Sequence, residues 1–360
     1  MSETEKSVLV GMSGGIDSTA VCQMLLQQGY RVVGLTFITC DSGLKSAEAA
    51  ARLSEKLGIE HHIADIREEF RNRVIQPFID DYLSGITPNP CVNCNLTVKF
   101  RILCEWADKF NCARIATGHY VNVVTEETDN GAKHYLVTGD DDSKDQSYFL
   151  WRLSQQQLGR VLFPLGGKIK SDVKKYLSDS GFEALSSGGE SMEVCFIPGD
   201  YRDFLKENIP DVEQRIKSGS FVDAAGKVLG THQGFPYYTI GQRKGLGIAL
   251  GYPAYVLKIN AAKNTVMLGE EQELKADYML IEEPEWVNGL PDEPLTVRIR
   301  YRSRPIPCDT PQKVNDGRYL VRLHTTASAI TPGQSAVFYV GNKVVGGAFI
   351  ASQRGINQWL

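Results

Sequence analysis

A short loop of small residues constrains the fold of this chain more than any other part of the sequence. It follows the apolar run Val8-Leu9-Val10 and precedes a stretch with apolar residues at helical spacing, and it reads Gly11-Met12-Ser13-Gly14-Gly15-Ile16-Asp17-Ser18. A buried strand that ends in such a loop and opens into a helix presents backbone N–H groups and the positive end of the helix dipole, which suit an anion. No Gly-Lys-Ser/Thr ends the loop, which excludes the Walker type. The segment predicts a phosphate-binding loop of another kind, with a plain glycine turn as the alternative.

The first third of the chain alternates between strand-like and helical runs. The expected strands are 8–10, 32–37, 60–66 and 114–117, and the expected helices begin at residue 17 and span 46–57. This alternation predicts an α/β fold built on a doubly wound parallel sheet, with a ligand crevice beyond the carboxyl ends of the strands. Past about residue 208, short β-like runs separated by Gly, Pro and Asn predict appended β modules. These runs are 255–259, 265–269, 295–299 and 336–340.

The composition is that of a globular protein. Of 360 residues, 42% are hydrophobic and 23% are charged, and no apolar run is long enough to cross a membrane. The polar, acidic N-terminus is unlike a secretory signal, so we expect a cytoplasmic location. In that reducing compartment most of the eight cysteines are expected to be thiols, with Cys22 in the core. The net charge of −4 gives nucleic acid no general attraction, so RNA affinity has to come from local basic clusters.

Two further segments place cysteines beside prolines. Pro88 and Pro90 precede Cys91 and Cys94, and Cys195 is followed by Pro198-Gly199. These neighbours predict loops that can expose a thiol. The Cys-x-x-Cys pair alone is compatible with half of a zinc site, a redox pair or catalytic thiols. The chain has no second Cys-x-x-Cys, which counts against structural zinc.

Basic residues gather in two places in the second half of the chain. Arg298, Arg300, Arg302 and Arg304 alternate, which predicts one face of a strand and a positive row that tracks phosphates. A solvated strand face is the alternative. Arg243 and its neighbour in Gly-Gln-Arg-Lys-Gly form a second exposed basic loop.

Seven blocks, in this order, make the sequence similar to the tRNA-specific 2-thiouridylases, a family of N-type ATP pyrophosphatases. The blocks span nearly the whole chain. They are the Ser-Gly-Gly-x-Asp-Ser loop, Asn-Pro-x-x-x-Cys-Asn at 89–95 with Lys99-Phe100, and the segments 116–120, 144–149, 195–197, 241–247 and 332–337.

The resemblance implies a reaction in two stages. ATP adenylates the position-2 oxygen of the wobble uridine, and sulfur then replaces that oxygen. Cys195 would carry the sulfur as a persulfide, with Cys94 as the catalytic partner that resolves the donor as a Cys94–Cys195 disulfide. The resemblance also implies ATP and Mg²⁺ as cofactors, tRNA with Lys, Glu or Gln acceptors as substrate, and a cysteine desulfurase or sulfur-carrier protein as a partner, with no membrane involved.

The same motifs carry expectations for domains and binding residues. We expect a catalytic domain at 1–208, a small central β-rich domain that contacts tRNA at 209–277, and a C-terminal β-barrel at 278–360. The expected ATP-binding residues are Gly11, Met12, Ser13, Gly14, Gly15, Ile16, Asp17, Ser18, Phe37 and Gly118. The expected tRNA-binding residues are Asn89, Pro90, Cys91, His119, Lys144, Asp145, Gln146, Arg243, Lys244, Arg300, Tyr301, Arg302 and Gln334.

Cys91 is a departure from the family pattern, which commonly has Asp at this position. A thiol with a lowered pKa could replace the carboxylate as acid or base. Alternatively, Cys91, Cys94 and Cys195 could hold a four-iron, four-sulfur cluster, with one iron open to the transferred sulfur. We favour the persulfide route because the rest of the chain follows the persulfide-type family.

Two other functions stay open on the sequence alone. One is a different pyrophosphate-loop ligase, against which the paired thiols count because nitrogen transfer needs no persulfide. The other is a non-catalytic, cluster-bearing tRNA-binding protein, which would release no AMP or pyrophosphate when tRNA is added.

Overall fold

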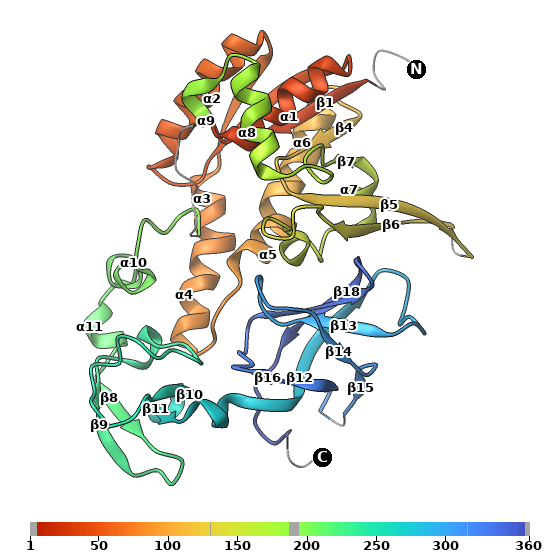
Figure 1. The fold of residues 1–360 in the computed structure, drawn as a ribbon. Helices are drawn as coiled ribbons and strands as arrows, with labels where there is room; N and C mark the ends of the chain where they lie inside the picture. The colour runs from red at the N-terminus through yellow and green to blue at the C-terminus, as the bar shows by residue number, and fades with distance from the viewer. Residues whose placement is uncertain (1–5, 130, 187–193, 315, 357–360) are drawn as a thin grey trace.

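Three sheets organise the computed structural model, which describes residues 6–129, 131–186, 194–314 and 316–356 (Figure 1). The first sheet is parallel and five-stranded, in the order β3-β2-β1-β4-β7. The order reverses between β1 and β4, where sheets of this kind bind their ligands. The predicted doubly wound parallel sheet is confirmed. Its strands are β1 (Ser7–Gly11), β2 (Arg31–Ile38), β3 (Glu60–Asp65), β4 (Arg114–Ala116) and β7 (Val161–Leu162).

Helices cover both faces of this sheet. Val8 and Val10 pack in one core cluster with residues of α1, whereas Leu9 packs in another with residues of α6. Burial on both faces explains why β1 is an uninterrupted apolar run instead of an alternating one. The helices around the sheet are α1 (Ile16–Gln27), α2 (Gly43–Leu57), α6 (Phe100–Lys109), α7 (Gln155–Arg160), α8 (Lys170–Asp179) and α9 (Glu183–Ser186).

A long helical connection leads from β3 to β4. It consists of α3 (Arg67–Phe70), a π-helical turn (Arg71–Ile75), α4 (Gln76–Leu83), α5 (Pro90–Cys94) and a second π-helical turn (Asn95–Lys99) that runs into α6. Figure 1 shows α4 extending from the first sheet towards the central one.

The segment that holds Cys91 and Cys94 is therefore helical, and the loop predicted for it is wrong. Pro90 occupies the first helical position of α5. At that position the missing N–H of proline costs no hydrogen bond, and its fixed φ suits the helix. The segment around Cys195 is irregular with a turn, as predicted.

The second and third sheets contain the β-rich part of the chain. The central sheet has the order β10-β11-β8-β9, and helices α10 (Tyr201–Asn208) and α11 (Val212–Arg215) precede it. In the third sheet β12 pairs with both β16 and β18, which closes a barrel and confirms the predicted C-terminal β-barrel. The strands are β8 (Gly219–Val222), β9 (Val228–His232), β10 (Tyr255–Asn260), β11 (Thr265–Gly269), β12 (Lys275–Trp286), β13 (Leu295–Arg298), β14 (Ile306–Cys308), β15 (Gln312–Lys313), β16 (Tyr319–Ser328), β17 (Ser335–Val340) and β18 (Lys343–Ile350).

A hairpin from the first part of the chain joins this third sheet. β5 (Val121–Thr128) and β6 (Gly131–Thr138) follow β4, and β6 pairs with β18 of the barrel. The hairpin thus connects the parallel sheet to the barrel (Figure 1). In the described part of the chain, no helix is both long and apolar enough to cross a membrane.

The arginine row does not lie along one strand, so that expectation is wrong. β13 ends at Arg298, and the chain then turns. The Ser303 hydroxyl donates to the Arg300 carbonyl (2.9 Å) and accepts from the Arg300 N–H (3.2 Å). These local hydrogen bonds replace those of a strand ladder.

Candidate active site at the switch point of the parallel sheet

The phosphate loop lies at the carboxyl end of β1, beside the switch point. Gly15 is the N-cap of α1 and has no side chain to cap it, so backbone N–H groups of the first turn face the loop. Ser18 stabilises the loop from within, because its hydroxyl accepts from the Ser13 N–H (3.2 Å) and donates to the Gly15 carbonyl (3.3 Å). Gly14 has a φ of +72°, and a Cβ there would lie 2.8 Å from the Ser46 carbonyl oxygen. The predicted strand–loop–helix is present, and no side-chain cap from Gly15 occupies the N–H groups at the start of α1.

Asp17 is the carboxylate of this loop. Lys170 Nζ donates to both of its oxygens at 2.7 Å, and the Tyr120 hydroxyl donates to Oδ1 at 2.8 Å. Gly118 packs directly over this residue, since a Cβ at Gly118 would come within 2.8 Å of Asp17 Cβ. The segment that follows β4 therefore packs against the first turn of α1 at Asp17.

Three thiols form the second part of the site. Cys91 and Cys94 are partly buried, and burial raises their pKa values to about 11 and about 12. Cys195 is exposed to solvent, yet desolvation by the surrounding protein also raises the pKa of its thiol. The Cys195 thiol contributes to the electrostatics of both Cys91 and Cys94, and Cys91 contributes to that of Cys94, whereas Cys40 is the thiol that acts on Cys195.

Lys99 is the cation that faces all three thiols. Its ammonium acts to lower the pKa of Cys91, Cys94 and Cys195 against the effect of burial. Cys94 and Lys99 are five residues apart, which is one turn of the π-helix between them, so they share a face. Lys99 thus opposes, without cancelling, the cost of forming a thiolate at this site.

His119 connects the thiols to the phosphate loop. It directly follows Gly118, its Nδ1 lies 2.7 Å from the Thr117 hydroxyl, and its ring stacks on Phe100 at 5.9 Å between centroids. Burial and the charge of Lys99 hold the pKa of His119 well below its usual range. The imidazole is therefore neutral at physiological pH and serves as a hydrogen-bonding group, not as a cation.

The three thiols do not fit the cluster alternative as they are arranged. Within the described ranges there is no group of three or more His, Cys, Asp or Glu residues placed to hold a metal ion. All eight cysteines are free thiols, including Cys94 and Cys195, and Cys22 is fully buried in α1 as predicted.

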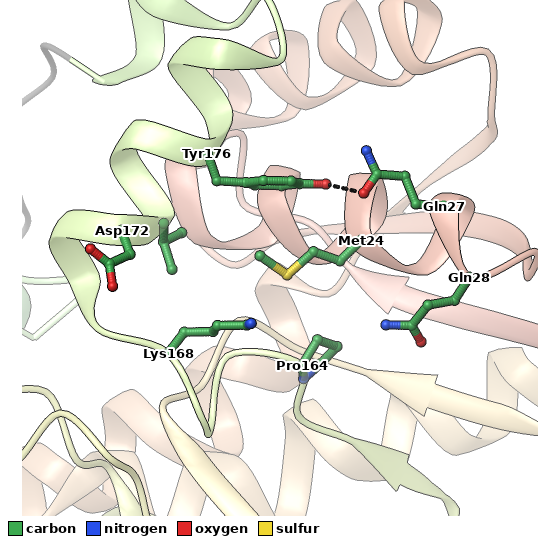
Figure 2. Close-up of a pocket in the computed structure, with 8 residues that line it drawn as sticks. Met24, Gln27, Gln28, Pro164, Lys168, Asp172 and Tyr176 are labelled. Atoms are coloured by element: carbon green, nitrogen blue, oxygen red, sulfur yellow. Dashed lines mark hydrogen bonds between the residues drawn. The ribbon is translucent and has the colours of Figure 1, made fainter.

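The structure has a cavity in the catalytic part and another in the central part. One of about 370 Å³ lies at the far end of α1 from Asp17, and the Lys168 side chain points into it beside Met24 and Pro164 (Figure 2). Another, of about 480 Å³, includes Arg243 and the exposed Tyr252 in its lining. The first cavity is lined by none of the predicted site residues.

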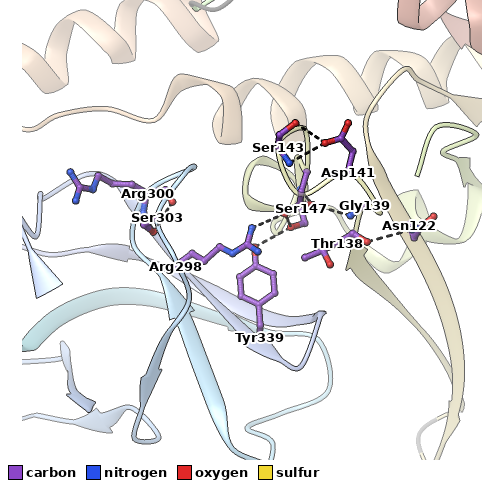
Figure 3. A network of polar contacts seen from close by, with 11 residues as sticks. Asn122, Thr138, Gly139, Asp141, Ser143, Ser147, Arg298, Arg300, Ser303 and Tyr339 are labelled. Carbon is purple, nitrogen blue, oxygen red and sulfur yellow. Dashed lines mark hydrogen bonds and ion pairs between the residues drawn. The ribbon is translucent and has the colours of Figure 1, made fainter. Parts of the chain in front are cut away.

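Several residues predicted to contact tRNA have partners inside the protein. Asp145 is buried, accepts from the Gly139 and Ser147 N–H groups, and forms an ion pair with Arg298 at 2.7 Å. Figure 3 shows Gly139, Ser147 and Arg298 of this network. Gln146 accepts from the Tyr120 N–H at 3.1 Å. This network ties the hairpin region to the barrel.

Gln334 fixes the segment that leads into α5. Its amide donates to the Thr87 and Pro88 carbonyls at 3.1 and 2.9 Å, just before Asn89. The barrel thereby positions the helix that carries Cys91. Lys144 is half-buried beside Asp145 in the same region.

The remaining predicted tRNA contacts lie on the surface. Arg243 and Lys244 are exposed in the central part, and Arg300 and Arg302 are exposed on the barrel. Tyr301 is half-buried, its ring lies against Phe149 at 4.4 Å between centroids with a tilt of 40°, and Cys91 contributes to the electrostatics of its hydroxyl. The Arg300–Arg302 turn therefore lies close to the thiols.

The sequence did not predict a role for two residues of the site, Lys99 and Lys170. Lys99 was visible next to a motif, but an ordinary α-helix would turn it away from Cys94, and only the π-helical turn at Asn95–Lys99 places both on one face. Lys170 lies 153 positions from Asp17, and no local pattern in the sequence marks it. Phe37, at the end of β2, is half-buried and packs against the core on this side.

Fold and loop together define the class of protein as an α/β nucleotide-binding domain of the HUP type. The family model described as tRNA methyl transferase HUP domain matches residues 6–199, the tRNA methyl transferase PRC-barrel domain matches 202–270, and the aminomethyltransferase beta-barrel domain matches 276–350.

Relatives that match over nearly their full length identify the family. A tRNA-specific 2-thiouridylase MnmA 3 of Phocaeicola vulgatus is 56% identical over 99% of this chain and 98% of its own length. A protein of the same name from Bacteroides fragilis is 58% identical over 99% and 97%, and a tRNA-specific 2-thiouridylase MnmA of Cytophaga hutchinsonii is 43% identical over 96% and 97%. The chain belongs to the family of tRNA-specific 2-thiouridylases.

Proposed function

We propose that this chain catalyses the ATP-dependent 2-thiolation of the wobble uridine of tRNA in the cytoplasm. The observation that carries the proposal is the continuity of the site. Gly118 packs over Asp17 of the phosphate loop, His119 follows it, and the ammonium of Lys99 acts on His119 and on the three thiols. This continuity supports an adenylating site and a sulfur-transferring site that lie next to each other. The proposal includes domains at 1–208, 209–277 and 278–360.

The loop supplies what adenylation needs. Its N–H groups can bind the phosphates of ATP, and Phe37 and Gly118 border the place for the nucleoside. Asp17 fits Mg²⁺, because this ion commonly takes one or two carboxylates together with substrate phosphates, and a third of the Asp17 side chain is open to solvent. Bound Mg²⁺ would balance phosphate charge. A uridine oxygen leaves poorly until it is esterified to AMP, which is why this step comes first.

Sulfur transfer falls to the cysteines. Exposed Cys195 can receive sulfur as a persulfide from a cysteine desulfurase or a sulfur-carrier protein. The terminal sulfur attacks C2 of the adenylated uridine, the new C–S bond replaces the C–O bond, and AMP leaves. Cys94 then attacks Sγ of Cys195, the persulfide S–S bond breaks, and its electron pair stays on the uridine sulfur. A cellular thiol reductant returns the resulting Cys94–Cys195 disulfide to two thiols.

The exposed basic residues suit the RNA. Arg243 and Lys244 on the central part and Arg300 and Arg302 on the barrel can contact phosphates on two sides of the crevice. The wobble base would leave its stack to reach Cys195, which single-stranded anticodon loops permit. We expect tRNAs for Lys, Glu and Gln as substrates.

A reconstituted reaction tests the proposal. Unmodified tRNA, ATP, Mg²⁺, cysteine and a cysteine desulfurase are supplied, and pyrophosphate release and 2-thiouridine are measured, the latter by mass spectrometry of digested tRNA. Cys195→Ser should release pyrophosphate but form no 2-thiouridine, and Asp17→Ala should do neither while still binding tRNA. Cys22→Ser, a core control, should keep both activities. Formation of 2-thiouridine by Cys195→Ser at the wild-type rate would remove the proposed donor.

A further inference from the structure

The ion pair between Lys170 and Asp17 places a second charged group at the phosphate loop. Lys170 begins α8, and its ammonium reaches both Asp17 oxygens at 2.7 Å. Only 12% of the Lys170 side chain is exposed, compared with 34% for Asp17. The ammonium is therefore mostly shielded from solvent and lies against the carboxylate of the phosphate loop.

The protein fixes this lysine from several directions. The Lys170 N–H donates to Asp141 Oδ2 at 3.0 Å, which pins the start of α8. Hydrogen bonds to this carboxylate hold the pKa of Asp141 below its usual range, so it stays ionised. The Lys170 ammonium also lies 5.6 Å from the centroid of the Tyr120 ring. Such fixing suits a group that must act at a defined position.

Stability alone gives a weak reason for the ion pair. A third of the Asp17 side chain is exposed, which weakens the pairing through solvent screening, and the Tyr120 hydroxyl already donates to Asp17. The loop, in contrast, lacks the lysine that a Walker loop would place on the β and γ phosphates. A cation for the leaving pyrophosphate has to come from elsewhere in the fold, and Lys99 faces the thiols instead.

We propose that Lys170 is the phosphate-binding cation of the adenylation step. In the nucleotide-free protein it neutralises Asp17, and with ATP bound it contacts the β- and γ-phosphates. When the uridine oxygen bonds to the α-phosphorus, the α–β bridging P–O bond breaks and its electron pair goes to pyrophosphate. Lys170 stays protonated and stabilises this developing charge. The inference rests on the proposed function only for the identity of the acceptor oxygen.

Nucleotide binding tests the assignment without any tRNA. Wild type, Lys170→Met, Lys170→Arg and the control Lys168→Met are titrated with α,β-methylene-ATP and Mg²⁺. Lys168 is a suitable control because it lies in the same segment but points into the cavity at the far end of α1 (Figure 2). We expect Lys170→Met to bind at least tenfold more weakly, Lys170→Arg to recover part of the affinity, and Lys168→Met to match wild type. Equal affinity in Lys170→Met and wild type would overturn the assignment.

A double variant separates contact with phosphate from mere neutralisation of Asp17. If Lys170 only cancels the carboxylate charge, Lys170→Met combined with Asp17→Asn should bind the analogue as well as Asp17→Asn alone, and that result would overturn the proposal. We expect the double variant to bind more weakly than Asp17→Asn. With tRNA present, pyrophosphate release by Lys170→Met should fall roughly 100-fold. Normal pyrophosphate release without 2-thiouridine in the wild type would refute the proposed function and leave the Lys170 result standing.

Discussion

Alkylation of the thiols at controlled pH measures how strongly burial suppresses the nucleophile of the proposed transfer step. Iodoacetamide reacts with thiolates, and an ordinary thiol with a pKa of 9.0 is ionised to about one part in ten at pH 8. Burial raises the pKa of Cys94 to about 12, so its ionised fraction at pH 8 is about one in ten thousand. Labelling of Cys94 in the folded protein should therefore be roughly 1000-fold slower than in the unfolded chain.

The same argument gives an order of reaction. Cys91, with a pKa of about 11, should be slowed roughly 100-fold, and exposed Cys195 should label first of the three. Because the raised pKa keeps the thiol neutral, the Cys94 rate should climb about tenfold per pH unit above pH 8 instead of levelling off near pH 9. Lys99→Met should slow Cys94 further, since the opposing charge is lost.

Mass spectrometry of peptides from a pH series gives the rates, and the chain unfolded in urea provides the reference for each cysteine. Lys109→Met, on the same helical connection but over the Trp106 ring, is a matched control for the lysine substitution. Labelling of Cys94 at pH 8 as fast as in urea, or a Cys94 rate unaffected by Lys99→Met, would refute the reasoning.

Three other substitutions test separate parts of the molecule. Cys91→Asp should retain substantial thiolation and the purified protein should need no iron; stoichiometric iron that is lost together with activity would favour the cluster instead. Arg302→Glu should weaken tRNA binding and reduce the salt slope of filter binding by roughly one, whereas Lys313→Glu on β15 should not; an unchanged slope would return Arg302 to a solvated surface. Arg298→Met should cost about 3 kcal/mol in urea unfolding because buried Asp145 loses its cation, and Asp145→Asn should recover part of that in the same background; additive losses would contradict the pairing.

Local patterns predicted the part of the site that is built from consecutive residues. The phosphate loop consists of the end of β1, the loop residues and the start of α1. Its geometry therefore depends on one continuous stretch of sequence. The doubly wound sheet followed in the same way, because apolar runs and helical spacing are short-range signals. Strand limits differed by one residue at an end, as at β2 and β4.

Features that depend on distant segments could not be predicted in this way. Lys170 meets Asp17 only after α8 packs beside α1. Alternation in the arginine row indicated a strand, but the Ser303 hydroxyl closes a turn and Arg298 pairs with Asp145, a residue of another segment. Pro90 was interpreted as a helix breaker, whereas its position at the first turn makes it a helix starter.

The hairpin of β5 and β6 also sets an order of events during synthesis. The edge of β6 that pairs with β18 stays unpaired until β18 leaves the ribosome, about two hundred residues later. Since the N-terminal part of a chain folds during synthesis, the hairpin forms before its partner strand exists. Until then the edge is an open template for pairing with another chain, and charges on the hairpin, such as the exposed Glu126 and Glu127 on β5 and the half-buried Lys133 on β6, are the kind of residues that discourage it. Lys343 then pairs with Glu126 as β18 docks. A nascent chain that stops before residue 343 would keep a finished nucleotide-binding core with an unprotected sheet edge, so truncated products are expected to aggregate.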